Sequence, residues 1–276
     1  MKDLLVVVGF AVAVSAYSPI DTDYHNTYGI PEAARIKLAE ESTDFDGSRI
    51  AGGNAARLGQ FPYLGGLLVS LTNGRQSACG SSLISATRAV TAAHCWVTRN
   101  ARARQVTVVL GSVTLFSGGV RVNSNNVRVH PSYNMDALTN DIAIIVLSSV
   151  PLNNNIRPIG IASGSNQYVG TWATASGFGR TSDNSAVSST LNHVNLQVIT
   201  NDVCRRTYGN TVIATTICTA TPNGRSICQG DSGGPLAVGD TLIGVTSFTH
   251  RQGCTRGHPA GFARVTSFNS WIRSNM

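Results

Sequence analysis

The sequence predicts a mostly β fold, and two observations support this prediction. Short runs of β-branched and apolar residues recur from Leu64 onwards, separated by clusters of Gly, Asn and Ser. Helical periodicity is sparse over the same region. Many short strands with turn signals between them are typical of a β-sandwich or a pair of β-barrels. The clearest runs are Leu67–Leu71, Arg88–Ala92, Val106–Leu110, Ile142–Leu147, Leu191–Ile199 and Leu242–Phe248.

One helix is predicted at the C-terminus, over Thr266–Ser274, where Phe268, Trp271 and Ile272 repeat at helical spacing. The chain of 276 residues is 42% hydrophobic and only 13% charged, which excludes an intrinsically disordered protein. It is long enough for one large β domain with a sizeable core.

The N-terminus predicts a secretory signal peptide at residues 1–16. Lys2 precedes an apolar run of about eleven residues that ends in small residues at Ser15 and Ala16. The run is too short to span a bilayer, and no other stretch approaches the required length. We therefore expect a secreted, extracellular protein with no membrane association, in a compartment where disulfides form.

Residues 17–49 differ in charge from the rest of the chain and predict an acidic pro-segment. They hold seven acidic and three basic residues, whereas residues 50–276 hold 17 Arg, six Asp, no Lys and no Glu. The boundary, Arg49–Gly53, places a basic residue before Ile50 in a Gly-rich setting that a trypsin-like protease would cut. The pro-segment contains no Cys to tether it, so we expect it to leave after the cut.

Three segments of the basic domain contain residues suited to nucleophilic catalysis. The strongest is Cys228–Pro235, in which Ser232 stands among three Gly that permit close approach of a substrate. A serine nucleophile needs a base, and His94 follows an apolar strand beside a Cys. That histidine needs an orienting carboxylate, and Asp141 precedes the apolar run Ile142–Leu147.

These motifs, Ala-Ala-His-Cys, Asp-Ile-Ala and Gly-Asp-Ser-Gly-Gly-Pro, resemble those of the chymotrypsin family of serine proteases, in the family's chain order. The resemblance covers residues 50–276. It implies two six-stranded antiparallel β-barrels with the active site between them and a C-terminal helix. It also implies a serine endopeptidase with Ser232 as nucleophile, His94 as base and Asp141 as the residue that orients it. The backbone N–H groups of Gly230 and Ser232 would form the oxyanion hole.

The resemblance further implies zymogen activation. After cleavage at Arg49, the new amine of Ile50 would turn inward and pair with Asp231, coupling the cut to assembly of the oxyanion hole. Ala51 stands where the family usually has Val. Its side chain is smaller, and the same activation step is expected.

The six Cys allow many complete pairings, and the sequence alone does not choose among them. The resemblance implies Cys79–Cys95, Cys204–Cys218 and Cys228–Cys254.

The resemblance also locates the pocket for the substrate residue before the scissile bond (P1). Ser226 stands where trypsin-like members carry Asp, so a preference for Arg or Lys is not expected. Ile227 adds apolar bulk, and Thr249 and Ala260 each add a side chain that is expected to narrow the slot. By the same resemblance, Ser247, Phe248 and Thr249 form the strand that pairs with substrate. We therefore expect an apolar P1 preference, with an elastase-like, broad or collagenolytic specificity as the alternative.

Composition adds three further expectations. A domain with Arg and no Lys keeps its charge at high pH, which resembles digestive enzymes of the insect midgut and indicates an alkaline gut lumen. The His residues show no metal-ligand spacing and no Glu follows residue 41, so neither metal nor cofactor is expected. The expected partners are protein substrates, an activating protease and protein inhibitors, with no nucleic acid, and the protein is expected to be a monomer.

The net charge of +7 also fits a different class, a non-catalytic protease homologue that binds polyanions. The presence of Ser232 favours the enzyme, because such homologues usually lose the nucleophile.

Overall fold

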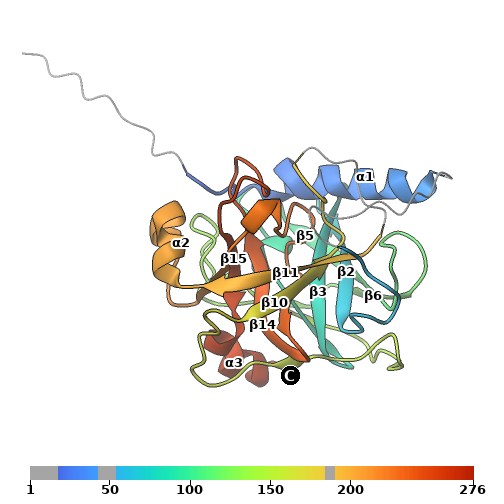
Figure 1. Ribbon diagram of the computed structural model, residues 1–276. Coiled ribbons are helices and arrows are strands. Elements are labelled where there is room, and N and C mark those ends of the chain that lie inside the picture. Colours follow the sequence, from blue (N-terminus) through green and yellow to red (C-terminus); the bar gives the residue numbers. More distant parts are fainter. Residues whose placement is uncertain (1–17, 43–53, 184–189) are drawn as a thin grey trace, which may run out of the picture.

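The computed structural model describes residues 18–42, 54–183 and 190–276. In these ranges two β-sheets lie side by side, and a helix from the N-terminal segment crosses one end of them (Figure 1). The predicted signal peptide and the Arg49–Ile50 junction lie outside the described residues. No helix among the described residues has both the length and the apolarity needed to cross a membrane.

The first sheet contains seven antiparallel strands in the order β6-β5-β2-β3-β4-β8-β7. It curls, but no strand pairing closes it within the described ranges. Its members are β2 (Leu64–Leu71), β3 (Gln76–Ser85), β4 (Arg88–Thr91), β5 (Ala103–Leu110), β6 (Val120–Ser124), β7 (Val127–Val129) and β8 (Ala143–Val146).

The second sheet closes into a six-stranded barrel, since β11-β10-β13-β14-β15-β12 ends on a pairing between β12 and β11. Two short strands, β1 and β9, extend it. Its members are β1 (Asn54–Ala55), β9 (Gly160–Ile161), β10 (Trp172–Gly177), β11 (Asn192–Ile199), β12 (Thr216–Thr219), β13 (Pro235–Val238), β14 (Thr241–Phe248) and β15 (Ala260–Arg264).

The predicted fold class is confirmed: the chain is mostly β, with a C-terminal helix, α3 (Val265–Ser274). The second sheet has the six-stranded barrel that was expected. The first differs in detail, because its seventh strand extends the sheet and its two edges are not paired. Each apolar run predicted to be a strand lies in one, with its core residues fully buried.

Two helices were not predicted. Helix α2 (Asn201–Tyr208) begins at Thr200, whose hydroxyl accepts the N–H of Val203. Helix α1 (Ile30–Glu41) lies in the N-terminal segment and follows a π-helical turn, His25–Gly29. Pro31 stands in the first turn of α1, where the N–H that proline lacks has no partner within the helix.

Helix α1 is packed against the body of the protein. Ala33 and Ile36, on its inner face, are buried among Leu68, Leu115 and Phe178. The helix lies over the first sheet and extends across the end where the two sheets meet (Figure 1).

Three disulfides join Cys79 to Cys95, Cys204 to Cys218 and Cys228 to Cys254. This is the pairing implied by the resemblance. Each bond closes a short loop, which in the chain-entropy model stabilises the folded state by about 3 kcal/mol.

Candidate active site

His94 and Asp141 meet between the two sheets. His94 lies in a short turn after β4, and Asp141 lies two residues before the start of β8, which pairs with β4. The Nδ1 atom of His94 is 2.7 Å from Oδ2 of Asp141, and the backbone N–H of His94 donates to Oδ1 at 2.9 Å. Both side chains are buried. The carboxylate therefore fixes the ring and favours a proton on Nδ1, which leaves Nε2 as the basic nitrogen.

Ser247 adds a third hydrogen bond to this carboxylate. Its hydroxyl donates to Oδ2 of Asp141 at 2.6 Å, from strand β14 of the other sheet. Ser247 was predicted to pair with substrate, and its contact with Asp141 was missed. This bond links strand β14, in the closed barrel, to the carboxylate that orients His94.

Ser232 lies on the tight loop before β13, opposite His94, and both residues line the same cleft. The loop needs glycine at position 233, where φ is +82° and a Cβ atom would lie 2.4 Å from the carbonyl oxygen of Gly80. The carbonyl of Ser232 accepts the N–H of Gly80 at 2.7 Å. The loop is thereby fixed against the first sheet.

Asp231 points away from the cleft. Its carboxylate accepts the N–H of Gly179 and the N–H of Cys228, both at 2.9 Å. Burial of the carboxylate, reinforced by the nearby negative charge of Glu32, raises the pKa of Asp231 to about 6. Its two backbone hydrogen bonds only partly oppose this rise.

Tyr24, from the N-terminal segment, occupies the centre of the cleft. Its ring lies against that of His94, with centroids 4.6 Å apart. Its hydroxyl donates to the carbonyl of Ala78 at 2.7 Å and lies near the Ser232 hydroxyl and the Gly230 N–H. Nε2 of His94 has no hydrogen-bond partner among the described residues. Tyr24 thus lies against both the proposed base and the proposed nucleophile.

The predicted pocket residues separate into two groups. Ile227 and Thr249 line the cleft, together with Phe248. Ser226 instead lines a small cavity beside Asp231, and Ala260 is fully buried. In this uncut chain the four residues therefore do not form one open pocket.

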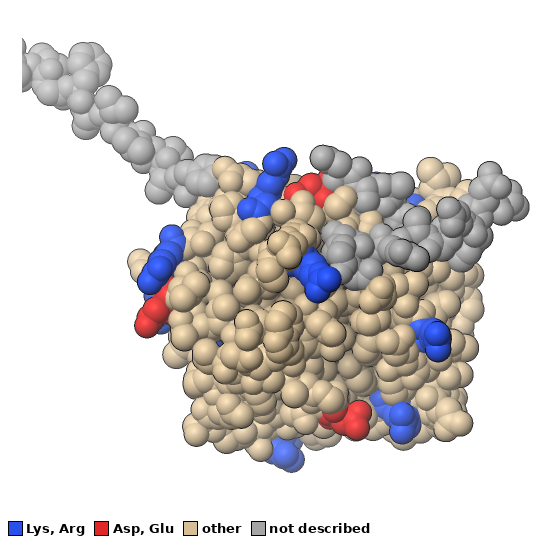
Figure 2. Space-filling view, in the orientation of Figure 1, with Lys and Arg blue, Asp and Glu red and all other residues tan. Residues whose placement is uncertain are grey.

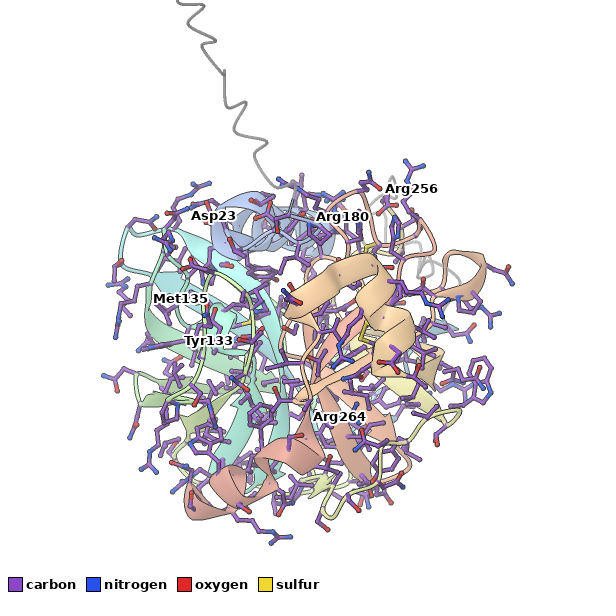
Figure 3. The ribbon with its side chains drawn as sticks, turned by 90° about the vertical axis from the view of Figure 1, so that its left-hand side faces the viewer. Asp23, Tyr133, Met135, Arg180, Arg256 and Arg264 are labelled. Atoms are coloured by element: carbon purple, nitrogen blue, oxygen red, sulfur yellow. A yellow bond between two sulfur atoms is a disulfide. The ribbon has the colours of Figure 1, made fainter. Side chains whose placement is uncertain are left out.

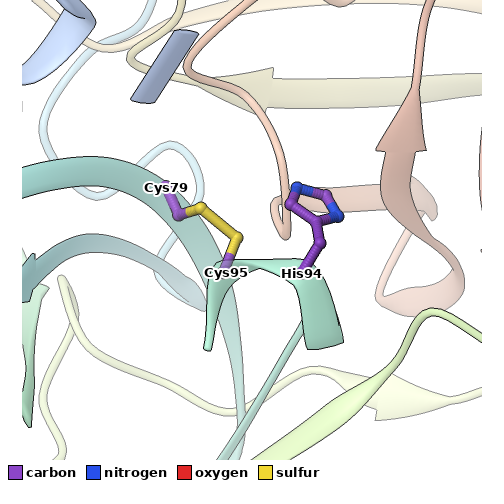
Figure 4. A group of neighbouring side chains, drawn as sticks. All are labelled: Cys79, His94 and Cys95. Carbon is purple, nitrogen blue, oxygen red and sulfur yellow. A yellow bond between two sulfur atoms is a disulfide. The ribbon is translucent and has the colours of Figure 1, made fainter. Parts of the chain in front are cut away.

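The disulfide between Cys79 and Cys95 anchors the turn that carries His94 (Figure 4). These three side chains lie close enough together to suggest a metal site. Both sulfur atoms are consumed by the disulfide, so the group does not offer the thiolates that a metal would need.

Two contributors to the site escaped sequence reasoning. One is the N-terminal segment, residues 18–42. Pro31 and the Ala-rich run after it signalled its helix, but nothing in the sequence signalled where that helix docks. The other is Arg180, whose Nε donates to Glu32 of this segment at 2.5 Å.

The closed barrel, the curled partner sheet and the His94–Asp141 pair, in a cleft that Ser232 also lines, define a chymotrypsin-fold hydrolase. The chain belongs to the trypsin family of serine proteases, whose family model, "Trypsin", matches residues 50–272.

Several known relatives support this assignment. The chain is 40% identical to the collagenase of Hypoderma lineatum over 233 residues, which cover 82% of this chain and 87% of the relative. It is 36% identical to trypsin delta of Drosophila melanogaster, over 82% of this chain and 88% of the relative.

Two solved structures are similar. HL collagenase superposes with a TM-score of 0.76 at 40% identity and covers 82% of this chain and 98% of its own. Mouse neuropsin, a serine protease, gives 0.71 at 27% identity and covers 81% and 98%.

Proposed function

We propose that this serine protease is a secreted endopeptidase made as a zymogen, activated by a cut after Arg49, that cleaves after apolar residues. The observation that carries the catalytic part is the hydrogen bond between buried His94 and Asp141, in a cleft also lined by Ser232.

In the proposed reaction, the Ser232 hydroxyl attacks the scissile carbonyl while Nε2 of His94 takes its proton. The imidazolium then protonates the leaving amine, and Asp141 stabilises its charge. The N–H groups of Gly230 and Ser232 stabilise the oxyanion, each contributing on the order of 3–4 kcal/mol to the lowering of the barrier. A water molecule then attacks the acyl-enzyme through the same steps, with His94 as base, and releases the acyl group from Ser232.

The surroundings of Asp231 support the proposed activation step. Its carboxylate accepts two backbone N–H groups, but none of the described residues forms a salt bridge with it. It borders a small cavity lined by Ala175, Val194 and Ile227. An apolar residue with a free amine, such as Ile50 after the cut, matches both the apolar wall and the acid. Export of the protein into an oxidising compartment, directed by the proposed signal peptide, agrees with the three disulfides.

The pocket supports an apolar P1 residue. Ser226 is buried and uncharged, so it cannot pair with the cation of Arg or Lys, and Ile227 adds apolar surface. Thr249 adds a branched side chain to the lining of the cleft. A narrowed pocket also supports the second candidate, an elastase-like or collagenolytic specificity, which a relative named collagenase favours.

A polyanion-binding homologue has less support. Basic side chains on the face in Figure 2 are separated by uncharged surface and do not form one patch. The absence of Lys from residues 50–276 supports work in an alkaline fluid such as a gut lumen.

The test is a P1 profile with Phe, Leu, Ala and Arg substrates before and after limited cleavage at Arg49, at neutral and alkaline pH. We expect activity only after the cut, highest for an apolar P1 residue and absent in Ser232→Ala. A dominant Arg preference would overturn the specificity. A correctly cut protein that cleaves no substrate would overturn the catalytic proposal, and collapse of the rate above about pH 9 would contradict the alkaline role.

A further inference from the structure

We propose that residues 18–42 are a built-in inhibitor that fills the cleft in the direction of a substrate and stays bound after the cut at Arg49. The inhibitory part of this proposal rests on the proposed catalytic function, whereas the binding part does not. Four sets of contacts carry it.

The first set lies at the catalytic centre. Tyr24, His94 and Ser232 line the same cleft, and the Tyr24 hydroxyl, which donates to the Ala78 carbonyl at 2.7 Å, lies near the Gly230 N–H, one of the two donors proposed for the oxyanion. The Tyr24 side chain therefore occupies the part of the cleft where a substrate would meet the proposed nucleophile. The Tyr24 side chain is buried, and its ring covers His94.

The second set lies upstream of Tyr24, along the strand expected to pair with substrate. The Arg251 N–H, three residues beyond the end of β14, donates to the Pro19 carbonyl at 2.9 Å. Ile20 is buried in a cluster with Leu138 and Phe248. This part of the segment occupies the surface proposed for the acyl side of a substrate.

The third set lies downstream, where the leaving-group side of a substrate would run. His25 is fully buried, with Nδ1 2.9 Å from the Ser77 hydroxyl on β3. Helix α1 then packs Ala33 and Ile36 into the core of the first sheet. The segment therefore passes the catalytic residues in one direction, from the acyl side to the leaving-group side.

The fourth set consists of polar anchors at the edges of the cleft. Glu32 is buried and accepts from Arg180 at 2.5 Å and Arg35 at 2.9 Å. Asp23 accepts from the side-chain amide of Asn100 at 3.0 Å. Figure 3 shows Asp23 and Arg180 at the same end of the molecule, one in the pro-segment and the other in a loop of the second sheet.

The local conformation explains why the segment blocks the cleft without being a substrate. Proteases bind extended peptides, which pair with a strand of the enzyme. Here the chain at Tyr24 already has helical dihedral angles, φ −48° and ψ −48°, and the Thr27 N–H donates to the Asp23 carbonyl. The oxygen near Gly230 and Ser232 is a phenol, which offers no bond to cleave.

Every contact above involves residues before position 43, so cleavage at Arg49 breaks none of them. The pro-segment was expected to leave because no disulfide tethers it. The buried face of α1 and the anchors of Glu32 indicate instead that it dissociates slowly.

The experiment uses the full chain with an enteropeptidase site at residues 45–49, which spares Arg35 and Lys37 from trypsin. The site is created by F45D, G47D, S48D and R49K. One form carries Ser232→Ala, so that the protease cannot degrade its own pro-segment. This form is cut and passed through a size-exclusion column at about 10 μM, and mass spectrometry identifies the components of each peak.

We expect the released segment to elute with the protease domain. Tyr24→Ala should weaken its retention at least about tenfold, equivalent to about 1.4 kcal/mol, because a buried ring and its hydrogen bonds are lost. Tyr24→Phe should weaken it less, and Leu38→Ala, on the exposed face of α1, should not weaken it. A segment that separates freely at this concentration overturns the proposal.

The form that keeps Ser232 tests inhibition. After complete cutting, the specific activity should rise on dilution, and the rise should be lost in Tyr24→Ala, which is fully active from the start. Full activity with the segment still bound would overturn the inhibitory role. A protease domain that is inactive even when separated from the segment would refute the proposed function and leave the co-elution result valid.

Discussion

The rings of Tyr24 and His94 lie 4.6 Å apart, at an interplanar angle of 56°. One residue belongs to the acidic N-terminal segment and the other to the basic domain, 70 positions further along the chain. Tyr24, His94 and Ser232 line the same cleft, so a side chain of the N-terminal segment lies beside both the proposed base and the proposed nucleophile. Under the proposed function we expect the uncut chain to be inactive for two reasons, the lack of a free Ile50 amine and the presence of Tyr24 in the cleft.

Asp141→Asn tests the orienting role of the carboxylate. An amide would present an N–H to Nδ1 of His94 and favour the wrong tautomer, so we expect kcat to fall about 10⁴-fold at neutral pH. Ser247→Ala is the companion variant. It removes one hydrogen bond to Asp141 but leaves both contacts with His94, so a loss of about tenfold is expected. Equal losses in the two variants would contradict the assigned roles.

Thr249→Gly tests the width of the P1 pocket. Removal of the branched side chain should open the slot and raise the ratio of kcat/KM for P1 Phe over P1 Leu about tenfold. Thr249→Ser is the matched control, since it keeps the hydroxyl and removes only a methyl group. A ratio that does not change in Thr249→Gly would show that another residue limits the pocket.

Asp231 makes the stability of the uncut protein depend on pH. Its pKa rises from 3.8 to about 6 on folding, so the folded protein holds this proton more tightly than the unfolded chain does. The contribution of Asp231 to the free energy of unfolding therefore falls as pH rises through this interval. The total loss is on the order of 3 kcal/mol by pH 7.

Denaturant unfolding of uncut Ser232→Ala protein at pH 4.5 and 7.5 measures this effect. Asp231→Asn, made in the same background, should become more stable relative to its parent as pH rises from 4.5 to 7.5, because the variant lacks the loss assigned to Asp231. If the stability of the variant relative to its parent does not change with pH, the dependence belongs to other groups.

Glu40 tests the attachment of the far end of α1. Its carboxylate accepts the backbone N–H groups of Leu115, Phe116 and Ser117, at 2.6 to 3.1 Å. Glu40→Gln replaces charge-assisted hydrogen bonds by weaker ones. Amide exchange in Ile30–Glu41 should accelerate about tenfold, for a loss of about 1.4 kcal/mol. Glu41→Gln is the adjacent control; its side chain is exposed, and exchange should not change.

The strands that the sequence predicted well are those with strong local signals. Strand β8 is a buried apolar run, and β14 contains one near its start, Leu242–Val245, so composition alone marks them. Strand β3 was missed, although it lies at the centre of the first sheet. It is rich in Ser and Gly because it passes very close to the Ser232 loop: a Cβ atom on Gly80 would lie 2.9 Å from Cα of Gly234. Close backbone approach selects small residues, which carry little strand signal.

The same limit applies to the site. His94, Asp141 and Ser232 stand in motifs whose neighbours reveal them, and the cysteine pairing follows from the resemblance. The role of Tyr24 depends on where α1 docks, and docking is set by a surface assembled from Leu68, Leu115 and Phe178, which are far apart in the sequence. No local pattern in residues 17–49 contains that information.

The uncut chain joins the pro-segment to the protease through a short connection that begins after Ser42. While that connection is intact, the segment meets the cleft at an effective concentration on the order of millimolar, whatever the amount of protein present. Once the connection is cut, occupancy of the cleft follows mass action. If the proposed inhibition holds, cutting makes it depend on protein concentration: the cut protein stays inhibited where it is stored at high concentration and becomes active as it is diluted.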